Sequence, residues 1–157
     1  MRGTMKAIFT VLTATILAFG AGAALADSYT QGNITITDPW SRETPPGVSK
    51  GVAYMKITNN GDVAVTLIDA ETTKTGDVTL HQSRMNGDLM TMRYVEGGLS
   101  IPAGETVELR PGGYHFMLEE LDRGLVRNES VAMTVFFEDA EAVNIKLQVK
   151  SAGEMHH

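Results

Sequence analysis

Hydrophobic and polar residues alternate in nine short segments of this chain. Most of these segments are rich in β-branched or aromatic residues, and clusters of Gly, Pro, Asn and Asp separate one from the next. A period of two is typical of strands with one buried face. The pattern therefore predicts an all-β fold, a sandwich or barrel, in a single domain spanning residues 27–150. The nine segments are residues 33–42, 51–60, 63–72, 76–82, 89–95, 105–111, 114–121, 130–138 and 142–150.

Residues 1–26 have the three parts of a secretory signal peptide. Arg2 and Lys6 supply positive charge, an apolar run follows, and Ala24-Leu25-Ala26 forms a small-residue cleavage site. A membrane anchor is the alternative, but threonines and glycines interrupt the run, and no later stretch reaches the roughly 18 apolar residues of a spanning helix. We therefore expect cleavage after Ala26 and an exported mature chain, residues 27–157, without a membrane span.

The charge balance and the missing cysteines exclude several functions. Removing Arg2 and Lys6 leaves 11 basic and 19 acidic residues, so the mature chain has a formal net charge of −8. This charge argues against nucleic acid as a partner. Without cysteine the exported chain has no disulfides, no thiol redox chemistry and no thiolate for a blue-copper site, so a hydrophobic core must stabilise it.

Soft metal ligands are concentrated between residues 81 and 117. Two of the four histidines of the chain, His81 and His115, lie at the ends of this stretch. The methionines of the stretch are Met85, Met90, Met92 and Met117. Imidazole and thioether groups without thiolate are the ligands expected for Cu(I), whereas zinc usually takes Cys, His or carboxylate. The composition of this stretch therefore predicts copper binding.

The spacing within residues 114–121 separates candidate ligands from core residues. His115 and Met117 are two residues apart, so on a strand they project from the same face and can contact one ion. Tyr114, Phe116 and Leu118 alternate with them and supply an apolar face for a core. We therefore expect His115 and Met117 to point away from the core.

Two other predicted strands carry ligands in the same way. His81 shares a face with Thr79, and Met90 shares a face with Met92. A single His or Met on a strand is more often a packing or surface residue, and this interpretation stays open. As a set, the candidate ligands lie on the phase opposite the apolar residues. Three strands side by side would bring them together.

Three motifs give the mature chain a family resemblance. The runs DPWSRETPPG, AYMKITNNG and LHQSRMNGDLMTMRYVEGGLSIPAGETVELRPGGYHFMLEEL resemble the periplasmic copper chaperone family PCu(A)C over nearly the whole mature chain. The resemblance implies a cupredoxin-like Greek-key β-barrel or sandwich. It also implies that one Cu(I) is bound by His81, Met92, His115 and Met117.

One spacing departs from the family pattern of His, ten residues, Met, a longer spacer and His-x-Met. Ten residues separate His81 from Met92, but 22 separate Met92 from His115, one more than in the family. Met90 shares the face of Met92 and stays open as the alternative ligand. Met85 and Met90 are expected nearby as secondary ligands.

The resemblance further implies a non-enzymatic carrier in the periplasm, expected to be a monomer. Such a carrier delivers Cu(I) to the binuclear copper centre of cytochrome c oxidase, through its subunit II or a Sco-like assembly protein, or to another exported copper protein. Two alternatives remain. One is a copper electron-transfer protein, which the lack of cysteine disfavours. The other is a β-sandwich binding or adhesion module that needs no metal.

Residues 151–157 follow the last predicted strand and are expected to form a flexible tail. The tail ends in Met155, His156 and His157, and adjacent histidines favour Cu(II). We therefore expect a second, weaker metal site there. An inert tail or the remnant of an expression tag is the alternative.

Overall fold

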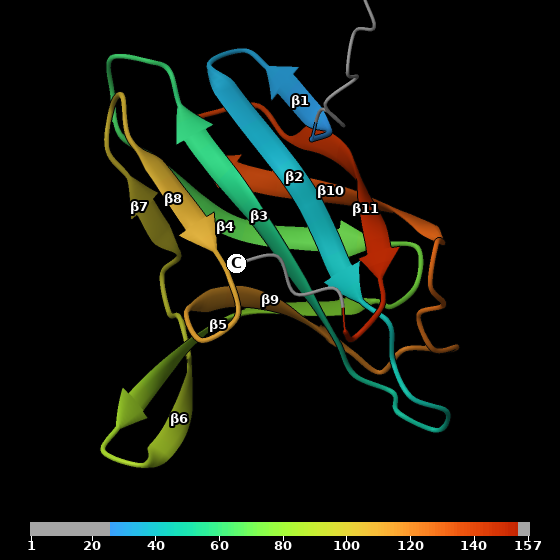
Figure 1. Cartoon of the computed structure of the whole chain (residues 1–157). Helices are drawn as coiled ribbons and strands as arrows, with labels where there is room; N and C mark the ends of the chain where they lie inside the picture. The colour runs from blue at the N-terminus through green and yellow to red at the C-terminus, as the bar shows by residue number, and fades with distance from the viewer. Residues whose placement is uncertain (1–25, 154–157) are drawn as a thin grey trace, which may run out of the picture.

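The computed structural model describes residues 26–153, and in this part of the chain it contains eleven β-strands and no α-helix (Figure 1). The predicted all-β class is confirmed. No element in this part is a helix with the length and apolar character that a membrane span requires. The strands are β1 Ser28–Gln31, β2 Ile34–Arg42, β3 Gly51–Asn59, β4 Val65–Thr72, β5 Asp77–Asn86, β6 Leu89–Tyr94, β7 Leu99–Ile101, β8 Thr106–Leu109, β9 Tyr114–Glu119, β10 Ser130–Glu138 and β11 Val143–Lys150.

All eleven strands belong to one strongly curved sheet. Its order is β6-β5-β9-β8-β3-β2-β11-β10-β4-β7, with β1 paired to β2 and a further pairing of β9 with β3. The sheet curls so that β4 and β10 cross behind β2 and β3 (Figure 1). Strands distant in sequence become neighbours in this arrangement, as in the parallel pairing of β11 with β2.

The core fills the inside of this curve. Its largest side chains with almost no exposure include Ile36, Ile57, Leu67, Phe116 and Leu147, each from a different strand. The alternation found in the sequence explains this, since every second residue of a strand points inward. On β9, Phe116 and Leu118 are fully buried in the core, as predicted.

The sequence pattern missed two strands, β1 and β7. They span four and three residues, so neither is long enough to show a clear alternation. Pairing partners determine both of them, because β1 pairs with β2 and β7 pairs with β4. These strands therefore depend on tertiary context.

The hairpin formed by β5 and β6 projects from the body of the sheet (Figure 1). Every residue of β6 is exposed, and so are the last three residues of β5, whereas the first half of β5 packs on the core. The core cluster contains no residue of β6. One half of β5 therefore belongs to the core and the other half to a protruding arm.

Asn59 at the end of β3 is a buried polar residue that connects three segments. Its side chain is fully buried. The Nδ2 group donates hydrogen bonds to the carbonyls of Val63 (2.8 Å) and Ile101 (3.0 Å), and Oδ1 accepts one from the Gly61 backbone N–H (3.0 Å). All three contacts are satisfied within the chain, so this side chain fixes the β3–β4 turn against β7.

Candidate metal centre

The candidate ligands lie on three adjacent strands, with β5 in the middle. β5 pairs antiparallel with β6 on one side and with β9 on the other. His81 on β5 lies directly opposite His115 on β9 and directly opposite Tyr94 on β6. Residues directly opposite in an antiparallel pair share a face of the sheet. The structure therefore places the two histidines side by side on the face away from the core.

The two imidazole rings are stacked against each other. Their centroids are 5.9 Å apart, and their planes differ by 20°. His81 is half-buried, and His115 is only 3% exposed. His115 lies off the core, as its position in the sequence predicts, but its side chain is also covered by neighbouring rings. Its burial follows from its position between the rings of His81 and Tyr54 on the flanking strands.

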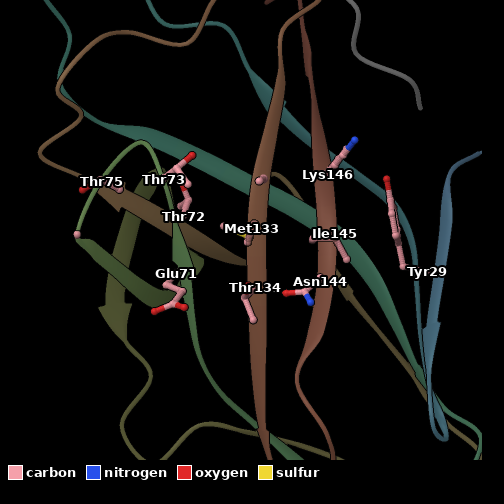
Figure 2. Close-up of a pocket in the computed structure, with 12 residues that line it drawn as sticks. Tyr29, Glu71, Thr72, Thr73, Thr75, Met133, Thr134, Asn144, Ile145 and Lys146 are labelled. Atoms are coloured by element: carbon pink, nitrogen blue, oxygen red, sulfur yellow. Dashed lines mark hydrogen bonds between the residues drawn. The ribbon is translucent and has the colours of Figure 1, made fainter.

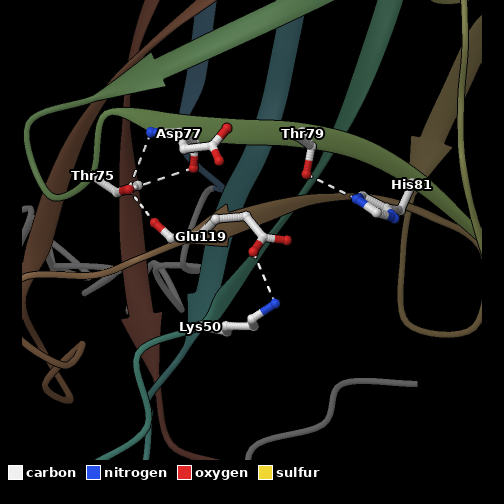
Figure 3. A network of polar contacts seen from close by, with 6 residues as sticks. All are labelled: Lys50, Thr75, Asp77, Thr79, His81 and Glu119. Carbon is white, nitrogen blue, oxygen red and sulfur yellow. Dashed lines mark hydrogen bonds and ion pairs between the residues drawn. The ribbon is translucent and has the colours of Figure 1, made fainter.

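Each histidine has one ring nitrogen with a hydrogen-bond partner and one without. The Nδ1–H of His115 donates to the carbonyl of Gly113 at 3.1 Å. Nε2 of His81 shares a hydrogen bond with the Thr79 hydroxyl at 2.8 Å, as Figure 3 shows. The remaining nitrogens, Nδ1 of His81 and Nε2 of His115, are buried and have no hydrogen-bond partner. A buried polar atom without a partner in the protein costs free energy, which binding of an ion or a water molecule would recover. A neutral imidazole offers its second nitrogen as a lone pair, which is what a metal ion requires.

The environment of His115 favours the neutral form of its ring. Burial lowers the pKa of His115 below its usual value, and the nearby His81 lowers it further, while the hydrogen bond to Gly113 acts in the opposite direction. A lowered pKa means that protons compete less with a metal ion for this nitrogen at a given pH. His115 is thus prepared to act as a ligand near neutral pH.

The lowered pKa of His115 predicts an acid-sensitive fold in the absence of metal. Below the ordinary histidine pKa of about 6.5, the unfolded chain binds a proton at this position before the folded chain does. Stability should therefore fall as the pH drops from about 6.5 towards the lowered pKa. Thermal unfolding of metal-free protein between pH 7.5 and 5 measures this effect. His115→Phe should show a weaker pH dependence, and equal slopes for the two proteins would contradict the prediction.

The thioethers lie around His81 on the same face. Met117 is opposite Thr79, and Met92 is opposite Ser83, so each lies one diagonal step from His81, on opposite sides. Such diagonal neighbours are about 7–8 Å apart and within reach of long side chains. Met90 is opposite Met85, one step farther along the hairpin. The strand register therefore favours Met92 over Met90 as the neighbour of the histidines.

Charged ligands do not complete a metal site in the described chain. Between residues 26 and 153, no three side chains of His, Cys, Asp or Glu are grouped so that they could hold an ion. Within these residues, thioether sulfur is offered beside the histidine pair by the half-buried Met117 and the exposed Met92 (49%).

The histidine pair is part of a row of rings across five strands, which the sequence analysis did not identify. Ring centroids are separated by 6.0 Å between Tyr94 and His81, by 6.5 Å between His115 and Tyr54, and by 4.7 Å between Tyr54 and Trp40. Tyr54 is buried on the face of β3 opposite its core residues. The sequence offered one signal for this row, because the aromatic Tyr54 stands at a strand position that alternation places on the face away from the core. These rings hold His115 in a defined orientation by packing.

Polar contacts tie the end of β9 to the residues just before β5 and just before β3, at the end opposite the hairpin. The Thr75 hydroxyl donates to the backbone carbonyl of Glu119, and the Glu119 carboxylate forms an ion pair with Lys50 at 2.9 Å (Figure 3). Asp77 lies opposite Glu119 in the strand register. These contacts help to hold the register that places His81 opposite His115.

A groove elsewhere on the molecule does not share this chemistry. It is lined by parts of β4, β10 and β11 and by Tyr29 of β1, with Glu71, Thr134, Asn144 and Lys146 among its side chains (Figure 2). Its lining contains no histidine and no residue of the histidine pair's strands. It is separate from the candidate metal centre.

Several predicted features lie outside the described residues. The signal peptide covers residues 1–26, of which only residue 26 is described, and Met155, His156 and His157 lie beyond residue 153. Cleavage after Ala26 and a metal site in the tail therefore stay predictions.

Comparisons with known proteins identify relatives of this chain. The model of the family described as "LpqE-like: Putative lipoprotein LpqE-like" matches residues 34–149. A curated relative, the "Putative lipoprotein Lxx21020" of Leifsonia xyli, is 26% identical over 94% of this chain and 87% of its own length.

Solved structures resemble the chain as well. The copper-bound PCuAC domain from PmoF2 has a TM-score of 0.68 at 26% identity, covering 80% of this chain and 98% of that domain. The Cu(I) form of DR1885 from Deinococcus radiodurans has a TM-score of 0.56 at 30% identity, covering 87% of each chain. The fold is thus that of PCuAC domains, and the predicted family resemblance is confirmed.

Proposed function

The chain belongs to the LpqE-like family, and we propose that the protein is a copper chaperone, which binds Cu(I) and passes it to a copper-accepting exported protein. Its structural relatives include a copper-bound PCuAC domain and a Cu(I)-bound protein. Copper is the cargo in this proposal, and the protein carries out no reaction on it.

The observation that carries the proposal is the pair of unpartnered nitrogens. Nδ1 of His81 and Nε2 of His115 are buried without a hydrogen-bond partner, on rings that are stacked next to each other. We propose that each of these nitrogens donates to one Cu(I). Thr79 and the Gly113 carbonyl then act as positioning groups, because they engage the other nitrogen of each ring.

Met92 and Met117 complete the proposed ligand set. Both lie one diagonal step from His81 and on the same face. Thioethers are neutral, soft donors, which suit Cu(I) and bind less firmly than thiolates. A set of two buried imidazole nitrogens and two thioethers, of which Met92 is exposed, therefore supports transfer to a partner whose own ligands approach the ion from the Met92 side.

The proposed acceptor is an exported copper protein, with cytochrome c oxidase subunit II or a Sco-like assembly protein as the specific candidates implied by the family resemblance. Transfer in the periplasm requires export, which the predicted signal peptide would supply. A carrier of this kind acts as a monomer, and it needs neither nucleic acid nor a membrane span.

A comparison of two methionines on one strand tests the proposed site. Met92→Leu keeps the side-chain volume but removes a donor beside His81, so we expect it to weaken Cu(I) binding by about 10-fold or more. Met117→Leu should have a similar effect. Cu(I) affinity is measured by competition with a chromophoric chelator under anaerobic conditions.

Met90→Leu is the matched control, because Met90 lies on the same face of β6 and is exposed to a similar degree (60%) but is one step farther from His81. The affinity of the Met90→Leu variant for Cu(I) at the histidine pair should stay within about twofold of wild type. Weaker binding by Met90→Leu with unchanged binding by Met92→Leu would reverse the assignment. Wild-type affinity in all three variants would refute the thioether ligands.

A further inference from the structure

Two exposed methionines face each other on the projecting hairpin. Met85 on β5 lies directly opposite Met90 on β6, and the two side chains are 62% and 60% exposed. By contrast, Met55 and Met133 lie in the core, and both are 2% exposed. Exposed apolar side chains gain no stability from burial, so packing does not account for this pair.

The geometry of the pair suits a shared ion. Opposite residues in an antiparallel ladder have Cβ atoms about 4.5–5.5 Å apart, and methionine has three rotatable side-chain bonds. Both sulfurs can therefore turn towards one soft cation. Two thioethers bind more weakly than a site that also contains imidazole, which favours rapid exchange.

The methionine pair is connected to the histidines along one face. Residues 81, 83 and 85 of β5 share this face, and Met92 lies opposite Ser83, between the methionine pair and His81. Four residues along the strand correspond to about 13 Å. Met92 divides this distance into two shorter steps.

Positive charge is kept off this face. Arg84 lies opposite Thr91, and Arg93 lies opposite Gln82, so both arginines fall on the other phase of the hairpin. The thioether face is therefore free of arginine charges that would repel a cation. Because the hairpin projects from the sheet, this face is open to solvent and to a partner protein (Figure 1).

We propose that Met85 and Met90 form a second, weaker Cu(I) site, from which the ion moves past Met92 to and from the histidine pair. The movement of the ion between this site and the histidine pair rests on the proposed chaperone function. The existence of the methionine site does not, because it depends only on the hairpin.

Methyl NMR tests this site directly. The protein is labelled with 13C at the methionine methyl groups and titrated with Ag(I), a redox-inert stand-in for Cu(I). The first equivalent should shift the methyl signals of Met92 and Met117, and further Ag(I) should shift those of Met85 and Met90. Each methionine methyl group has its own resonance. Binding at the C-terminal tail therefore shifts the signal of Met155 and is distinguished from binding at the hairpin.

Three variants make the result decisive. Met85→Leu combined with Met90→Leu should lose the second set of shifts, keep the first, and release Cu(I) to a chelator more slowly. Leu89→Ala is the control, because it removes the most exposed large apolar side chain of the hairpin while keeping both sulfurs, and it should behave as wild type. His81→Phe should lose the first set of shifts and keep the second.

The outcomes separate the two proposals. Silent Met85 and Met90 methyls beside shifted Met92 and Met117 methyls would overturn the methionine site alone. Shifts at Met85 and Met90 without any at Met92 and Met117 would support the methionine site and count against the histidine site. Equal shifts at buried Met55 would show nonspecific binding and would overturn the proposal.

Discussion

His115→Phe is expected to weaken Cu(I) binding by on the order of 100-fold or more. Loss of a group that only orients a metal ligand typically costs 10- to 100-fold in affinity, so loss of the ligand itself should cost at least the upper end. Phenylalanine keeps a ring between His81 and Tyr54 and removes only the nitrogens, which limits damage to the packing. His81→Phe should have an effect of similar size.

Affinity is measured by anaerobic titration against a Cu(I) chelator, with circular dichroism to show that each variant is folded. Tyr94→Phe is the control, because it keeps the ring that contacts His81 and loses only a hydroxyl group. Its affinity should stay within a few-fold of wild type. If both histidine variants bound Cu(I) as tightly as wild type, the histidine pair would not be the copper site.

Asn59→Ala is expected to lower the free energy of unfolding by about 3 kcal/mol, because it removes a fully buried side chain that is hydrogen-bonded to three backbone groups, at about 1 kcal/mol for each bond. The groups are the carbonyls of Val63 and Ile101 and the backbone N–H of Gly61. This loss is large compared with the roughly 5–15 kcal/mol that stabilise a domain. Urea unfolding of the metal-free protein measures it.

Asn60→Ala is the matched control for this substitution. Asn60 is the next residue along the chain, but it is exposed, and its side chain makes one hydrogen bond, to Thr35 at 3.0 Å. Its removal should cost less than about 1 kcal/mol. Equal losses in the two variants would show that the buried contacts of Asn59 have no special weight. The Cu(I) affinity of folded Asn59→Ala should be unchanged, because Asn59 is not on the ligand strands.

The amino-acid sequence alone was enough to predict the all-β class, nine of the strands and the face on which the candidate ligands lie. Residues 115–118 illustrate why. Alternation places His115 and Met117 opposite Phe116 and Leu118 on any extended strand, whatever its neighbours are. Donor chemistry is likewise a property of the residues, so copper could be proposed from His and Met without Cys.

Only the tertiary structure decided how the strands meet. The register that sets His81 opposite His115 joins residues 34 positions apart, and the ring of Tyr54 that covers His115 comes from another strand. The partners of Asn59 and the short strands β1 and β7 depend on the same long-range pairing. The physical reason is that alternation is set by neighbours along the chain, whereas burial and register are set by the strands that pack together in the folded sheet.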